Sequence, residues 1–279
     1  MLGRLSILVL MAGALLAGVA RERQSRHEGT LVSFLSVGQG DCTVVMSDGW
    51  VVLVDVGPKS DTFDAGARLV VPELRRLGVR QIDCLVLTHP DSDHVGGLGA
   101  VMRRYRVGRV VVSAAFQRDE NMLAWLEGAG VTPEQVAWLN GPAVAELGGI
   151  TLTLAPPPFG VETSDNDRSL FVRIDVGAGS VAMSGDAGME VEKAIGGDWD
   201  VQVLKAGHHG SNGSTGVQWL GATTPEVVVA SCGRRNTYGH PHPDMVQRVQ
   251  DAGAEFLSTD RDGSVTFVLG GSGFVRETN

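Results

Sequence analysis

The segment His89-Pro90-Asp91-Ser92-Asp93-His94 limits what this chain can fold into more than any other feature. It places four potential metal ligands within six residues, directly after the apolar run Ile82–Leu87, which is typical of a strand buried on both faces. Imidazole nitrogens and carboxylate oxygens are ligands of zinc, manganese and iron, and the share of carboxylates favours the harder ions. In an extended turn, positions 89, 91 and 93 would face one site and position 94 a neighbouring one. A surface turn with chance histidines does not account for this density of ligands after an apolar strand.

Three further segments place polar residues next to predicted strands. Asp186 follows the strand 180–183, His208 and His209 follow the strand 201–204, and Asn166 precedes the strand 170–176. An aspartate after a strand is usually a turn former, so any one of these segments is weak support. Their recurrence, with glycine beside Asp186 and beside the histidine pair, favours a site to which both halves of the chain contribute.

The apolar pattern predicts many strands and few helices, distributed over both halves of the chain. The expected helices are 65–77, 97–105, 189–194 and 243–252, with Pro72 an awkward interior residue in the first. The expected strands are 30–37, 43–46, 50–55, 82–87, 107–113, 150–155, 170–176, 180–184, 201–205, 227–231, 255–258 and 264–269. No linker separates the halves, so the pattern indicates one α/β domain of two packed sheets with helices outside.

Seven blocks of sequence resemble the metallo-β-lactamase fold superfamily, in particular the hydrolase domain of ComEC/Rec2-type competence proteins. The resemblance covers roughly residues 30 to 270 and lies in the order in which that family carries its motifs. The blocks are Ser36-Val37-Gly38-Gln39-Gly40-Asp41, Leu53-Val54-Asp55-Val56-Gly57, Thr88-His89-Pro90-Asp91-Ser92-Asp93-His94-Val95-Gly96-Gly97, Asn166-Asp167-Arg168-Ser169-Leu170, Ser184-Gly185-Asp186, Leu204-Lys205-Ala206-Gly207-His208-His209-Gly210-Ser211 and Tyr238-Gly239-His240-Pro241-His242-Pro243.

This resemblance implies a four-layer αβ/βα sandwich with two divalent metal ions, zinc or manganese, at the strand ends. The first ion would be bound by His89 and Asp91, and the second by Asp93 and His94. Asp186 would bridge the two ions, and His208 would complete the ligands of the second ion. The superfamily's commonest pattern has histidines where this chain carries Asp91 and Asn166, and the ComEC-like group shares both departures. They leave the first site poorer in nitrogen, which makes manganese credible.

Several residues keep two interpretations. Asp41 and Asp55 are either carboxylates that orient a ligand histidine or turn formers at strand ends. His209 can replace His208 as the ligand, although His208 is favoured because it comes first after the strand. Asn166 is a further possible ligand.

The chemistry expected of such a site is hydrolysis, since two metals activate a water and clamp a phosphoryl centre. Asp93 or Asp186 would orient the water, and His240, favoured over His242, would supply a proton to the leaving group. The side chains expected to hold the substrate phosphate are Lys205, Ser211, Arg234, Arg235, Asn236 and His242.

The resemblance makes DNA the expected substrate of a phosphodiesterase or nuclease, acting with channel proteins in DNA uptake. The formal net charge of −9 weakens a nucleic-acid function without excluding it, because bound cations would offset clustered carboxylates. The alternatives are another hydrolase of the superfamily, acting on a thioester, lactone or β-lactam, and a non-catalytic binding protein. The oligomeric state cannot be predicted from these patterns.

The first 28 residues are expected to be a signal peptide or membrane anchor followed by a linker, and residues 29–279 the hydrolase domain. Arg4 precedes the apolar run Leu5–Ala20, which is shorter than the roughly 20 residues of a bilayer span. The run is a cleaved signal, a retained anchor, or else a misassigned start or a buried helix. The first two interpretations place the domain outside the cytoplasm. The three cysteines show no zinc-site spacing and allow at most one disulfide.

Overall fold

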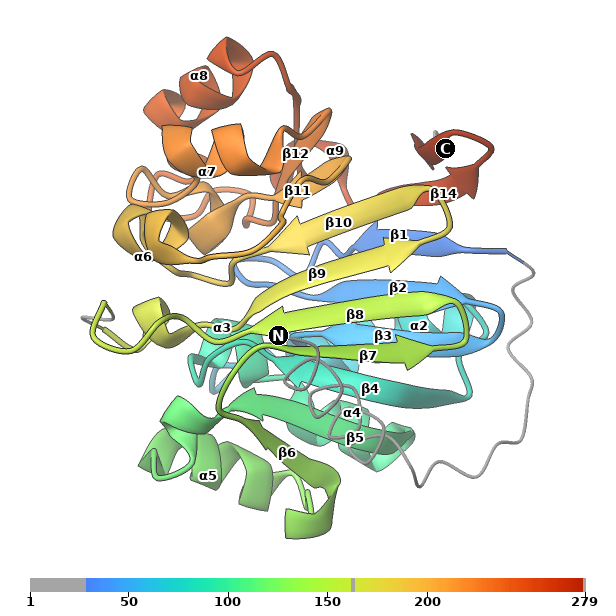
Figure 1. The fold of residues 1–279 in the computed structure, drawn as a ribbon. Helices are drawn as coiled ribbons and strands as arrows, with labels where there is room; N and C mark the ends of the chain where they lie inside the picture. The colour runs from blue at the N-terminus through green and yellow to red at the C-terminus, as the bar shows by residue number, and fades with distance from the viewer. Residues whose placement is uncertain (1–28, 162–163, 278–279) are drawn as a thin grey trace, which may run out of the picture.

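Two β-sheets pack face to face in the computed structural model, which describes residues 29–161 and 164–277, and helices cover their outer faces (Figure 1). The first sheet has eight strands in the order β15-β14-β1-β2-β3-β4-β5-β6, and the second has seven in the order β13-β12-β11-β10-β9-β8-β7. The strands of the first sheet are β1 Leu31–Phe34, β2 Thr43–Ser47, β3 Trp50–Val54, β4 Gln81–Leu87, β5 Arg106–Ser113, β6 Val136–Leu139, β14 Val265–Gly270 and β15 Gly273–Arg276. Those of the second are β7 Ala143–Leu147, β8 Ile150–Ala155, β9 Phe171–Val176, β10 Gly179–Met183, β11 Val203–Lys205, β12 Val227–Ala230 and β13 Glu255–Ser258.

The apolar side chains divide into three buried layers, which is what a four-layer sandwich requires. In β4, Leu85 faces the helices on the first sheet, whereas Cys84 and Val86 face the second sheet. A third layer lies between the second sheet and its own helices and includes Leu204 and Trp219. The predicted αβ/βα sandwich is therefore confirmed.

The helices on the first sheet are α2 Val71–Arg76, α4 Leu98–Arg104 and α5 Glu120–Gly128, and those on the second are α6 Met189–Ala194, α7 Val217–Thr223 and α8 Pro243–Asp251. Single helical turns α3 Ser92–Val95 and α9 Thr259–Asp262 lie in loops, and 3-10 turns occupy Ala114–Phe116, Pro133–Gln135, Asn166–Arg168 and Gly207–Gly210. The predicted helix 65–77 is divided into a π-helical turn, Gly66–Val70, and α2. The division places Pro72 in the first turn of α2, where its missing N–H costs nothing.

The parallel strands determine where the functional loops meet. Strands β3 to β6 run parallel to one another, as do β10 to β13. In Figure 1 the arrow of β10 ends on the side of the molecule where α3 lies. The loops that follow β4, β10 and β11 therefore open at the same edge of the sandwich.

Two further sequence expectations concern the cysteines and the N-terminal segment. The cysteines Cys42, Cys84 and Cys232 are all buried and free, so no disulfide forms among them. The predicted signal or anchor lies outside the described residues. Within 29–161 and 164–277, no helix has both the length and the apolar character needed to cross a bilayer.

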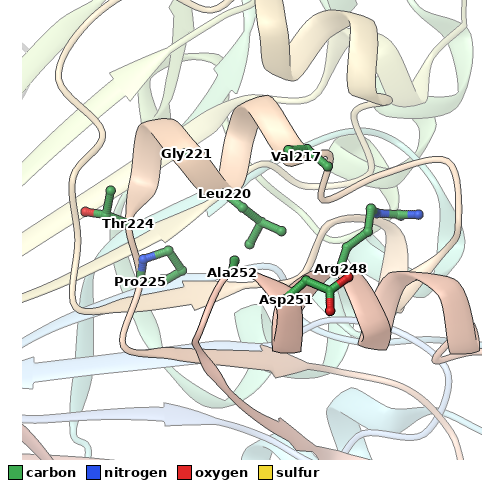
Figure 2. A pocket seen from close by; sticks show the side chains of 8 residues that line it. All are labelled: Val217, Leu220, Gly221, Thr224, Pro225, Arg248, Asp251 and Ala252. Atoms are coloured by element: carbon green, nitrogen blue, oxygen red, sulfur yellow. The ribbon is translucent and has the colours of Figure 1, made fainter.

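A separate hollow of about 390 Å³ lies between α7 and α8 (Figure 2). Leu220 of α7 and Ala252, just after α8, form its apolar floor, and Arg248 and Asp251 are the charged residues in its lining. The Arg248 guanidinium is already engaged, because it donates to the backbone carbonyls of Asn212 and Ser214. This hollow therefore offers little chemistry.

Candidate metal centre

Asp186 lies at the centre of four imidazole rings that come from distant parts of the chain. Its carboxylate oxygens are 3.2 Å from Nε2 of His94, 3.4 Å from Nε2 of His209, 3.6 Å from Nε2 of His208 and 3.9 Å from Nε2 of His89. The first and last of these rings follow β4, the middle two follow β11, and Asp186 itself follows β10. The structure thus brings together the segments that the sequence analysis expected to meet.

Asp55 orients the two histidines that follow β4. Its Oδ2 lies 2.8 Å from Nδ1 of His94 and accepts a hydrogen bond of 2.8 Å from the Thr88 hydroxyl. That hydroxyl lies 3.1 Å from Nδ1 of His89, from which it accepts a hydrogen bond because its own proton is committed to Asp55. Both rings therefore keep a proton on Nδ1, so Nε2 is the nitrogen that faces Asp186 and can give up its proton to a cation, which is the arrangement that a metal ligand needs.

Asp41 has the same relation to His209. Its Oδ1 lies 3.2 Å from Nδ1 of His209, which also lies 3.1 Å from the carbonyl oxygen of Ser231. Its Oδ2 lies 2.5 Å from Nζ of Lys205, so the ammonium compensates the buried carboxylate. Asp41 and Asp55 thus back ligand-type histidines, and the turn-former alternative does not describe their contacts.

The residues fit a pair of divalent cations. Within the described residues, Nε2 of His89, Nε2 of His94 and Oδ1 of Asp186 are buried without a hydrogen-bond partner. Buried polar atoms are rarely left unpaired unless an ion or water satisfies them. Donors held about 2.1 Å from a tetrahedral cation lie about 3.4 Å apart, which is close to the separations found here. His89 and Asp91, 3.6 Å apart, define one side of Asp186, while His209 and Asp93, 3.1 Å apart, define the other.

The two consecutive histidines differ in a way that the sequence did not indicate. His209 is buried, backed by Asp41, and has Nε2 beside Asp93. The His208 side chain is 37% exposed and turns its Nε2 to Asp186. This geometry favours His209 over His208 as the partner of Asp93, contrary to the preference based on chain order. His208 is left to face Asp186 from the open side of the groove.

The sequence analysis expected an extended turn for the ligand loop after β4, but the loop is not extended. Asp91 has extended dihedral angles, but Ser92–Val95 form one helical turn whose N–H groups at His94 and Val95 donate to the carbonyl of Asp91. The turn directs His94 into the core, where it is fully buried, and leaves the Asp93 side chain 33% exposed at the groove. Position 94 faces inward because of helical geometry rather than strand alternation.

Left-handed backbone conformations occur at three positions of the site. Asp55, His208 and His209 have φ values of 58°, 47° and 55°, a region that residues other than glycine adopt at a cost of about 1–3 kcal/mol. Gly40, with φ of 148°, lets the loop after β1 approach the ligand loop, because a Cβ there would lie 2.3 Å from the carbonyl oxygen of Asp93. The fold maintains this strain where it positions ligands.

Mutual electrostatics shift the pKa values of the central groups. Burial alone would lower the pKa of the His94 and His209 imidazoles, but Asp186 and the backing carboxylates hold both well above their usual range. Burial would likewise raise the pKa of the Asp186 carboxyl, yet His209 and His94 hold it well below its usual range. Carboxylates and imidazoles therefore compensate one another, and a bound cation would take over that role from the imidazole protons.

A groove of about 470 Å³ opens onto the metal centre. Its walls add residues that the sequence analysis did not single out as site residues, namely Gln39, Pro58, Ser92 and Tyr238. Gln39, Ser92 and Tyr238 belong to blocks that carry the family resemblance, which was the available signal for them. His240 also lines the groove, as expected, and its pKa is lowered by burial and by the neighbouring His209 and His208.

The structure does not bring the expected phosphate-binding side chains into this groove. Lys205 is buried behind His209, Arg234 donates to the carbonyl of Asp260, and Asn236 folds back onto His240 and Gly233. The other members of the predicted set have local roles or exposed positions: Ser211 accepts from Gly213, His242 caps the start of α8, and Arg235 is exposed. Asn166 lies in a 3-10 turn and does not line the groove.

The sequence of this chain matches a family profile and several curated proteins. The profile of the Metallo-beta-lactamase superfamily matches residues 35–234. The chain is 29% identical to ComE operon protein 3 of Bacillus subtilis, over 85% of this chain and 32% of that protein. It is 33% identical to competence protein ComA of Neisseria gonorrhoeae, over 87% of this chain and 33% of that protein. The chain thus spans about a third of the length of these curated relatives.

Solved structures show the same fold at low identity. The diiron β-hydroxylase CmlA of Streptomyces venezuelae matches with a TM-score of 0.59 and 18% identity, over 87% of this chain and 55% of that one. The metallo-beta-lactamase fold protein YhfI of Bacillus subtilis matches with a TM-score of 0.56 and 11% identity, over 85% of this chain and 99% of that one. The family resemblance and the predicted type of fold are therefore both confirmed.

Proposed function

Because the chain belongs to the metallo-beta-lactamase superfamily, we propose that it is a metal-dependent phosphodiesterase whose substrate is DNA. The fold is that of metal-dependent hydrolases, and the similarity to competence proteins extends over most of the chain. The observation that carries the proposal is the convergence of four histidine Nε2 atoms on Asp186, with carboxylates behind two of the rings. Such a centre holds divalent cations, which activate water and stabilise charge on phosphoryl oxygens.

The chain's own residues divide the work around the groove. With a cation bound, His89, His94 and His209 would present unprotonated Nε2 atoms, and Asp186 would present Oδ1 toward His94 and Oδ2 toward His89 and His209. Asp93 is the carboxylate best placed to orient a water, because its side chain is partly exposed at the groove while its Oδ2 lies 3.1 Å from Nε2 of His209. His240 on the facing wall supplies a ring nitrogen to the substrate.

The groove suits an extended phosphodiester better than a compact ligand. Tyr238 is 69% exposed at the groove, and its ring stacks on that of His240 at 5.8 Å and 28°. An exposed aromatic face beside the reaction centre can support a base or sugar of a nucleic acid strand. The acidic lining of Asp91, Asp93 and Asp186 repels a polyanion unless cations are bound, so DNA binding is expected to need the metal as much as cleavage does.

The experiment is cleavage of linear and plasmid DNA by the full chain with Mn²⁺ or Zn²⁺, compared with Asp93→Ala and Asp186→Ala. We expect metal-dependent cleavage that both substitutions reduce by a factor of a hundred or more, on the order of what a metal-site ligand supplies. Nitrocefin and a thioester serve as competing substrates. Hydrolysis of either of these without DNA cleavage would refute the proposal in favour of another hydrolase. Failure to bind metal after reconstitution would favour a binding protein.

We further propose that the protein acts outside the cytoplasm, attached to or exported through the membrane by residues 1–20, and that it cooperates with DNA-uptake channel proteins. The support is the apolar composition of the run after Arg4 and the similarity of this chain to about one third of the length of two competence proteins. Fractionation of cells that express the full chain tests the location, and co-purification with channel components tests the partnership.

A further inference from the structure

The side chain of Gln39 bridges two loops at the groove. Its hydrogen bonds go to Gly233 and His240 and not to the proposed metal ligands. Gln39 follows β1, and its side-chain oxygen Oε1 accepts a hydrogen bond of 3.0 Å from the backbone N–H of Gly233. Its amide nitrogen Nε2 lies 3.4 Å from Nδ1 of His240. The approach of the two loops needs glycine at position 233, because a Cβ there would lie 2.8 Å from the backbone nitrogen of Gln39.

The contact with Gly233 determines which end of the Gln39 amide faces His240, and with it the direction of the hydrogen bond between Gln39 and His240. A backbone N–H can only donate, so the atom of the Gln39 amide that faces Gly233 must be the oxygen. The other end of the amide is then the NH₂ group, which can only donate as well. Nδ1 of His240 must therefore accept, and the ring proton of the neutral imidazole must lie on Nε2.

The surroundings of His240 fix the ring in this arrangement. Its backbone N–H donates to Oδ1 of Asn236, and its ring stacks on Tyr238 and meets the His208 ring edge-on at 5.9 Å. With Nδ1 occupied by Gln39, Nε2 is the ring nitrogen left for a ligand in the groove. This is the opposite arrangement to that of His94 and His209, whose Nδ1 atoms lie against carboxylates and whose Nε2 atoms face Asp186.

We propose that Gln39 is a positioning residue that holds His240 as the Nε2–H tautomer, so that His240 donates a hydrogen bond to a non-bridging phosphoryl oxygen of the substrate. This inference rests on the proposed phosphodiesterase function. In this proposal the proton stays bonded to Nε2 of His240 throughout the reaction. The N–H dipole stabilises the negative charge that grows on the phosphoryl oxygen. The proton for the leaving alkoxide comes from solvent or from the water that is consumed, rather than from His240.

The structural half is tested by nitrogen NMR of the full chain in its zinc-loaded and metal-free forms, with His240→Asn used to assign the signals. We expect Nε2 of His240 to carry the proton at mildly alkaline pH in the wild type. In Gln39→Glu, a side chain of nearly the same shape, the carboxylate accepts from Nδ1–H and the proton moves to Nδ1. A wild-type ring with its proton on Nδ1 overturns the inference, whether or not the protein proves to be a phosphodiesterase.

The functional half is tested with two phosphodiesters that differ in their leaving group. Bis(p-nitrophenyl) phosphate releases a stable phenolate, whereas a DNA strand releases an alkoxide that needs a proton. If His240 stabilises a non-bridging oxygen, Gln39→Leu should lower kcat on both substrates by the same factor, roughly tenfold, and His240→Asn by roughly a hundredfold. If His240 were the proton donor, only DNA cleavage would fall, and that result overturns the inference while leaving the proposed function intact.

The zinc content of the Gln39→Leu variant is the control for both the NMR test and the kinetic test. Gln39→Leu should bind as much zinc as the wild type, because Gln39 makes no hydrogen bond to the ligands around Asp186. Loss of zinc in this variant would show that Gln39 acts through the metal centre and would also overturn the inference. A wild type that cleaves neither phosphodiester refutes the proposed function, and the NMR experiment still decides the tautomer.

Discussion

Replacement of Asp55 by asparagine is the sharpest perturbation of the metal centre. Oδ1 of Asp55 accepts from the backbone N–H of Thr88, and Oδ2 faces the Thr88 hydroxyl and Nδ1 of His94. In Asp55→Asn the amide oxygen must stay opposite the Thr88 N–H, which can only donate, so the NH₂ group faces His94. Nδ1 of His94 then accepts, its proton moves to Nε2, and that nitrogen can no longer bind a cation.

The expected loss can be estimated because other effects of the substitution are small. Asparagine has nearly the same shape as aspartate and tolerates the left-handed backbone of position 55, where φ is 58°. Removing the partner that orients a metal-binding histidine typically costs 10- to 100-fold in metal affinity, or about 1.4–2.7 kcal/mol. The reversed hydrogen bond also disturbs His89 through the Thr88 hydroxyl, so we expect the upper part of this range.

Calorimetric titration of the metal-free protein with Zn²⁺ measures this loss, and Asp83→Asn is the matched control. Asp83 is also buried in the first sheet and accepts from the backbone N–H of Val51, but it lies in the middle of β4 away from the groove. We expect an unchanged zinc affinity in Asp83→Asn. Equal affinities for wild type and Asp55→Asn, or an equal loss in both variants, would refute the reasoning about the tautomer.

Three other predictions follow from the structure. Burial raises the pKa of Glu192 to about 7 despite backbone N–H groups that favour its ionised form, so the folded state holds this proton more tightly than the unfolded chain. The contribution of the protonated Glu192 to the free energy of unfolding is complete below about pH 4.5. It is lost as the pH rises through 7, a loss of roughly 3 kcal/mol. Urea unfolding of Glu192→Gln in EDTA should lack this part of the pH dependence. Gly97→Ala should destabilise the fold by about 3 kcal/mol, as severe overpacking does, because its Cβ would lie 2.1 Å from the carbonyl oxygen of Val56. Gly97 immediately precedes α4, and Gly99→Ala inside α4 should be neutral or stabilising in the same urea assay. Metal at a hundred times its Kd should raise the wild-type unfolding free energy by about 2.7 kcal/mol, and thermal scans of Asp186→Ala should show almost none of this gain.

The amino-acid sequence alone determined the architecture and most of the candidate metal ligands. Apolar runs that alternate with short polar loops specified two packed sheets, because each strand must bury one or both faces. The cluster from His89 to His94 was visible because four ligands directly follow an apolar strand. Asp186 and the His208-His209 pair could be proposed because they follow strands whose ends a parallel sheet brings to one edge.

Tertiary structure decided which atom of each residue faces the site. The side chains of His208 and His209 diverge because both residues adopt left-handed backbone angles, which no spacing in the sequence reveals. Lys205 turned out to be buried against Asp41 instead of facing a phosphate, since it ends β11 on the same inner face of the sheet as Val203. Gln39 meets His240 across 201 positions of sequence. Proton positions on these rings depend on partners from distant strands, and hydrogen-bond direction is a property of the assembled fold rather than of any local segment.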